Sequence, residues 1–84
     1  MTEPELKEAA LACGRAFRRY VKEANATHRM LSRLTGPVTV EQRLAVNAQH
    51  LRESEAQIAY VATREALFEV LRVPATSKSG DGSI

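Results

Sequence analysis

The 84-residue chain has few of the residues that build large cores, covalent cross-links or membrane spans. Its single cysteine, Cys13, excludes a disulfide within the chain. Aromatic residues make up 5% of the sequence and tryptophan is absent, so large core side chains are scarce. No apolar run approaches the roughly 18 residues of a membrane-spanning helix, and the acidic N-terminus does not resemble a secretion signal. We therefore expect a small cytoplasmic domain with a thin core.

The chain also lacks the residue patterns that carry catalysis. It has no Ser/His/Asp arrangement, no phosphate-binding glycine loop and no paired acids, so we expect neither an enzyme nor a bound cofactor. The spacing His50-x-x-Glu53 reverses the Glu-x-x-His order of helical metal sites, so with Glu23 and His28 it does not predict a metal centre. Cys13 is interpreted as a small core residue.

One break divides an otherwise helical pattern. Thr35-Gly36-Pro37-Val38-Thr39 combines a glycine suited to a helix end with a proline that cannot continue the helix. Thr39 and Gln42 then have the spacing of a capping box. The sequence therefore predicts an all-α antiparallel hairpin over residues 1–74, with helices at about 3–34 and 39–73. The Ser/Gly-rich residues 75–84 are expected to form a flexible tail.

Both predicted helices carry side chains at alternating spacings of three and four, the 3.5-residue period of a coiled-coil seam. In the first helix the predicted seam comprises Leu6, Ala10, Cys13, Phe17, Tyr20, Ala24, Thr27, Leu31 and Leu34. In the second it comprises Val40, Leu44, Asn47, Leu51, Ser54, Ile58, Val61, Glu65 and Phe68.

A turn at Pro37 pairs residues whose numbers sum to roughly 75. Phe17 then lies near Ile58, and Leu6 lies near Phe68. Asn47 falls near Thr27, where it either forms a buried polar pair that fixes the register or faces water at the seam edge.

The second helix has another apolar face, roughly opposite the predicted seam. It consists of Val46, Tyr60, Leu67 and Leu71. A lone hairpin cannot cover two faces of one helix, so we expect this face to bind a protein partner or a second copy. Coverage by the tail is the alternative.

A basic stripe is predicted on the first helix, opposite its seam. Residues 14–33 hold six basic side chains against Glu23 alone. The stripe comprises Arg15, Arg18, Arg19, Lys22, Arg29 and Arg33. Such a stripe suits phosphates, anionic lipid or an acidic protein, and equally a face that is merely solvated. No aromatic residue is interleaved with it, which favours solvation or protein contact over nucleic acid.

The residues of the second helix also carry a family resemblance. Gly36-Pro37, Val40-Glu41-Gln42, Leu51, Glu55, Ile58, Val61 and Arg64 are similar to the second half of small type III secretion proteins of the YscE/EscE/SsaE kind. Members of that family are helical hairpins. The resemblance implies a co-chaperone that, with a larger helical-repeat partner, keeps the needle subunit soluble in the cytoplasm.

Two functions are thus compatible with the sequence. The leading hypothesis is a protein-binding hairpin, a cytoplasmic co-chaperone or adaptor for type III secretion. The alternative is a dimeric hairpin that binds RNA or another anionic ligand through the basic stripe, by analogy with small helical regulators.

Overall fold

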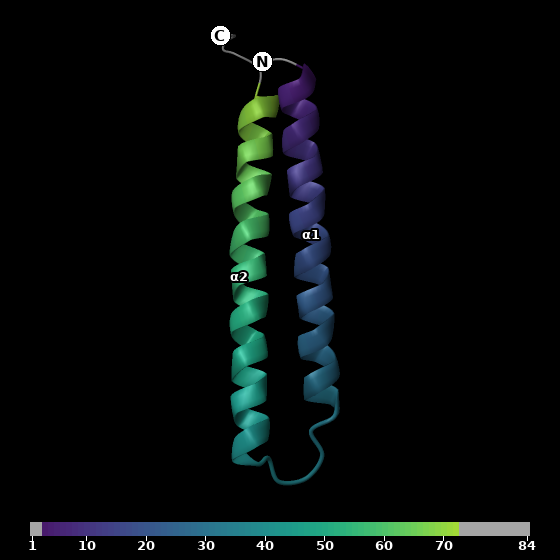
Figure 1. Ribbon diagram of the computed structural model, residues 1–84, viewed down its shortest axis with the longest axis vertical. Coiled ribbons are helices and arrows are strands. Elements are labelled where there is room, and N and C mark those ends of the chain that lie inside the picture. Colours follow the sequence, from purple (N-terminus) through teal and green to yellow (C-terminus); the bar gives the residue numbers. More distant parts are fainter. Residues whose placement is uncertain (1–2, 73–84) are drawn as a thin grey trace, which may run out of the picture.

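A computed structural model of the chain describes residues 3–72, which form two long helices joined by one turn (Figure 1). Helix α1 spans Glu3–Ser32 and helix α2 spans Val40–Leu71. The helices run antiparallel and side by side along their lengths, and no strand occurs among the described residues. The predicted helical hairpin is therefore confirmed, with each helix ending within two residues of its expected boundary. The predicted tail, 75–84, lies outside the described residues.

The turn forms for the reasons that its residues predict. Gly36 has a φ of 75°, in the left-handed region where a Cβ is strained. Thr39 caps α2: its Oγ1 accepts from the Gln42 amide at 3.1 Å, and its own amide donates to Gln42 Oε1 at 2.9 Å. Two otherwise unpaired amides at the helix start are thereby satisfied. Both the turn and the predicted capping box are present.

The helices meet along stripes with the expected 3.5-residue period, but the stripes are not the predicted ones. The α1 stripe consists of half-buried residues: Leu6, Ala9, Cys13, Ala16, Tyr20, Glu23, Thr27, Met30 and Leu34. We call the half-buried or buried stripe of α2 its inner stripe: Gln42, Val46, Gln49, Glu53, Ala56, Tyr60, Thr63, Leu67 and Val70. The seam of α1 keeps five of nine predicted positions, whereas that of α2 keeps none.

The predicted α2 seam was therefore wrong, and it faces outward. We call this set, from Val40 to Phe68 as listed above, the outer stripe. It lies about 160° around α2 from the inner stripe at 100° per residue. Phe17 accordingly packs against Tyr60, with ring centroids 5.2 Å apart, while Ile58 is 69% exposed. Residues that face each other across the helices still have numbers that sum to roughly 75, as predicted. The difference is that α2 is rotated about its own axis.

Packing between the helices is thin. Ala56 is fully covered and Gln49 is 5% exposed, and they are the two buried residues among positions 3–72. The molecule measures 62 × 29 × 15 Å, so its shortest dimension is that of a single helix layer. Neither described helix contains an 18-residue stretch apolar enough to cross a lipid bilayer. A single layer leaves the outward side of each helix uncovered.

Candidate functional site

The seam between the α1 stripe and the inner stripe of α2 is polar at its centre, where hydrogen bonds cross between the helices. Gln49 donates from Nε2 to the Glu23 main-chain oxygen at 3.0 Å and to Glu23 Oε1 at 2.8 Å. Gln49 Oε1 in turn accepts from Arg52 at 3.3 Å. Because a buried amide without partners is costly, these bonds select one rotation of α2 and one register against α1.

Aromatic contacts flank this polar centre on the side towards the chain ends. The Tyr60 ring lies 5.2 Å from Phe17 and stacks on Tyr20 at 6.0 Å with an interplanar angle of 7°. Separations and angles of this kind are favourable for aromatic pairs. Next to Tyr60 along the seam, Ala56 is fully covered. Tyr60 is therefore engaged within the hairpin.

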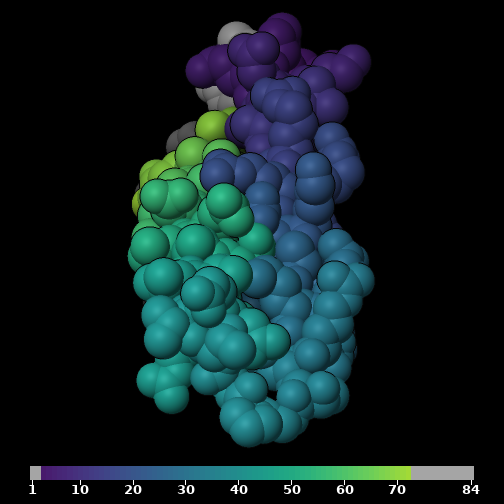
Figure 2. All heavy atoms as spheres, turned by 60° about the horizontal axis from the view of Figure 1, so that its bottom comes forward, coloured from purple at the N-terminus to yellow at the C-terminus, as the bar shows by residue number. Residues whose placement is uncertain are grey.

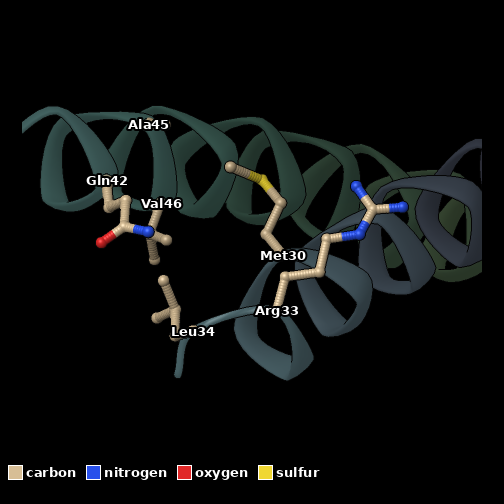
Figure 3. A pocket seen from close by; sticks show the side chains of 6 residues that line it. All are labelled: Met30, Arg33, Leu34, Gln42, Ala45 and Val46. Atoms are coloured by element: carbon tan, nitrogen blue, oxygen red, sulfur yellow. The ribbon is translucent and has the colours of Figure 1, made fainter. Parts of the chain in front are cut away.

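Near the turn, apolar side chains converge on a shallow hollow of about 210 Å³. Its lining comes from both helices and from Arg33 and Leu34, just after α1 (Figure 3). Leu34 and Val46 point towards one another, and Met30 extends towards α2, whereas the Arg33 guanidinium points away from them. The space-filling view towards the turn shows the two helices as adjoining ridges (Figure 2). Gln42 and Arg33 are the polar members of this otherwise apolar lining.

The predicted partner-binding set is divided by the structure. Val46, Tyr60 and Leu67 are half-buried on the inner stripe, whereas Leu71 is 43% exposed at the end of α2. Three of the four residues therefore contribute to the hairpin itself. A partner cannot reach these three residues fully while α1 is in place.

The outer stripe presents the apolar surface that the inner stripe lacks. Its large side chains are exposed as follows: Val40 68%, Leu44 64%, Leu51 64%, Ile58 69%, Val61 47% and Phe68 53%. They follow α2 almost from end to end at the spacing of a coiled-coil seam. Asn47, Ser54 and Glu65 are its polar members. Solvated helix faces rarely carry six such side chains in register, so this stripe is the candidate functional site.

Charged side chains border the outer stripe on both sides. Glu41, Glu55 and Glu69 are exposed along one side, which we call the acidic edge, and Glu69 also pairs with Arg72 at 2.6 Å. Arg43, His50 and Arg64 are exposed along the other side, the basic edge. The Arg64 guanidinium carbon lies 5.8 Å from the centre of the Phe68 ring, so this edge directly adjoins the apolar surface.

The chain matches no family model, no curated protein and no solved structure. The resemblance to type III secretion co-chaperones thus remains a prediction from the residues that carry it.

The basic stripe of α1 is present as a surface. All six of its members are exposed: Arg15, Arg18, Arg19, Lys22, Arg29 and Arg33. Five of them lie on α1, and Arg33 follows directly after its last residue, Ser32. The four residues considered for metal binding are arranged differently: Glu23 and Glu53 lie on the seam, whereas His28 and His50 are exposed. Across residues 3–72 no three metal-binding side chains come together.

Proposed function

We propose that the chain is a helical hairpin that works by binding another protein, and that the outer stripe of α2 is its contact surface. The observation that carries this proposal is the exposure of Leu44, Leu51 and Ile58, each above 60%, beside a seam that is partly polar. Fully burying one such side chain stabilises a complex by about 1.5–3 kcal/mol. A helix that covered the stripe would gain several of these contributions.

The contact surface proposed here replaces the one expected from the sequence. A partner or a second copy was expected on Val46, Tyr60, Leu67 and Leu71, of which three already pack within the hairpin. That expectation came from an excess of apolar surface on α2. The excess is present in the structure, but it lies on the opposite side of the helix, on the outer stripe. We therefore still propose a protein-binding hairpin, with the outer stripe as the contact surface.

On the resemblance of residues 36–64 we further propose a cytoplasmic co-chaperone of a type III secretion system. In that role the hairpin would help a helical-repeat partner hold the needle subunit. The support is the matching residues together with an apolar surface of the kind a co-chaperone needs. Co-expression with a needle subunit and its helical-repeat chaperone tests this role, since a stable complex of the three is expected.

Affinity capture from the native cells tests the broader proposal. Leu51→Glu and Ile58→Glu each place a charge in the outer stripe and should abolish capture of the specific partner. Ala66→Glu is the matched control, because Ala66 is exposed on α2 and lies outside the outer stripe. The proposal is wrong if both stripe variants retain the partner while their helix content and thermal unfolding match the wild type.

The exposed basic stripe supports a second candidate function, the binding of RNA or another anionic ligand. Neutralisation of phosphates by these arginines would release counterions, so the affinity would fall steeply with salt. Titration of a labelled RNA between low and physiological salt tests this candidate. Loss of binding in Arg18→Glu/Arg29→Glu, with Leu51→Glu unaffected, would favour it over the protein-binding function.

A further inference from the structure

The edges of the outer stripe define what kind of helix fits it. We infer that the occupant is an amphipathic helix of another protein whose two borders carry opposite charge, basic against Glu41, Glu55 and Glu69 and acidic against Arg43 and Arg64. This inference rests on the proposed protein-binding function and specifies the partner of that same surface. The stripe runs from residue 40 to residue 68, so the partner helix needs about 28 residues, or roughly 42 Å.

Symmetry argues against a second copy in the antiparallel orientation. Two α2 helices paired antiparallel about a two-fold axis bring each edge against the same edge of the other copy. The acidic edge then meets carboxylates, with Glu55 close to its own counterpart. The basic edge likewise brings Arg43 and Arg64 against guanidinium groups. Like charges facing one another along an interface disfavour this pairing.

Symmetry also disfavours the parallel orientation. A two-fold axis along the helices brings the acidic edge of one copy against the basic edge of the other, which is favourable. The same axis, however, places each residue of the outer stripe against the identical residue of the second chain. Glu65, exposed on the outer stripe, would then be buried against Glu65 of the second chain. An uncompensated pair of carboxylates inside a helical seam is costly, so a second copy fits in neither orientation.

A helix from another protein has neither restriction. Its apolar seam can lie on Leu44, Leu51 and Ile58 while its two borders differ in charge. Because the charges of one border attract the acidic edge and those of the other attract the basic edge, such a helix avoids every like-charge contact. The 3.5-residue spacing of the outer stripe fits a partner whose apolar residues follow the same repeat.

Three synthetic peptides of about 28 residues provide the test. All share a leucine seam with 3.5-residue spacing and differ in the residues that border it. One carries lysine on one border and glutamate on the other, one carries lysine on both, and one carries glutamate on both. Fluorescence anisotropy with labelled peptide at nanomolar concentration gives each affinity. The mixed peptide should bind about ten-fold more tightly than either uniform peptide, since several flanking pairs act together.

Charge reversal on the protein makes the test specific to the edges. Arg43→Glu/Arg64→Glu gives the stripe two acidic edges, so the preference should change to the peptide with lysine on both borders. Arg18→Glu/Arg29→Glu makes the same change of net charge on α1 and should leave the preference for the mixed peptide unchanged.

Three results would overturn the inference. Equal binding of all peptides that is lost in Leu51→Glu would reject the charge assignment and leave the protein-binding function intact. Failure of all three peptides to bind would reject the helical occupant. Sedimentation of the wild type as a dimer and of Leu51→Glu as a monomer would identify a second copy as the occupant.

Discussion

Gln49 of α2 and Glu23 of α1, 26 residues apart in sequence, are joined by two hydrogen bonds from one amide nitrogen. One bond reaches the main chain of Glu23 and the other its carboxylate, at 3.0 and 2.8 Å. This pair lies at the polar centre of a seam across which few large apolar side chains meet. It therefore specifies the rotation of α2 that leaves the outer stripe uncovered.

Removing the Gln49 amide should weaken the hairpin. Gln49→Ala deletes both bonds and leaves the half-buried Glu23 carboxylate without this donor, so we expect a loss of about 1–3 kcal/mol in unfolding free energy. Urea denaturation followed by circular dichroism measures it. Gln57→Ala, exposed on the same helix, is the control and should change stability by less than about 0.5 kcal/mol. Equal effects of the two substitutions would contradict a buried role for Gln49.

Truncation of outer-stripe residues should leave the isolated hairpin almost unchanged. Leu51→Ala and Ile58→Ala remove side chains that are 64% and 69% exposed, and each should cost less than about 0.5 kcal/mol. Tyr60→Ala, which loses the contacts with Phe17 and Tyr20, should cost about 2–4 kcal/mol. Thermal unfolding of the three variants decides between the two faces of α2. The reverse order of effects would restore the seam predicted from the sequence.

Enlarging Ala56 should force the helices apart. The residue is fully covered, so Ala56→Leu overpacks the seam and should destabilise the hairpin by about 1–3 kcal/mol. Ala62→Leu makes the same change at an exposed position of α2 and should be nearly neutral. Chemical denaturation compares the two variants, and a neutral Ala56→Leu would show that the helices are not in close contact there.

Gly14 in α1 and Gly36 in the turn should respond differently to replacement by alanine: one substitution should raise the stability of the hairpin and the other should lower it. Gly36 has a positive φ, so Gly36→Ala should destabilise by about 1 kcal/mol although no atom lies within 4 Å of the added Cβ. Gly14 lies within α1, and its added Cβ would meet only Arg18 Nη1 at 3.5 Å, so Gly14→Ala should stabilise by about 0.5–1 kcal/mol. Melting temperatures that change in the same direction would contradict this account.

The hairpin could be predicted because its signals are local. Gly36, Pro37 and the Thr39–Gln42 capping box act within a few residues, and both helices carry the 3.5-residue period throughout. The lengthwise register also follows from the short turn. These features do not depend on which faces of the helices meet.

The face of α2 could not be chosen correctly from hydrophobicity, because α2 carries two stripes with the same period. The more apolar stripe, with Leu44, Leu51 and Ile58, is the natural choice for a core, yet it faces outward. Hydrogen bonding of Gln49 and stacking of Tyr60 select the other stripe. One signal was available: a second apolar face on α2 implied that one of the two would need a partner.

The thin core also links the amount of this protein to that of its partner. Only Gln49 and Ala56 are buried among residues 3–72. The hairpin therefore has little internal packing to resist unfolding and proteolysis. A ligand that binds only the folded chain adds RT ln(1 + [L]/Kd) to its stability, about 2.7 kcal/mol at a hundred-fold excess over Kd. Cells that lack the partner should therefore degrade the hairpin faster, and its steady-state level would report how much partner is present.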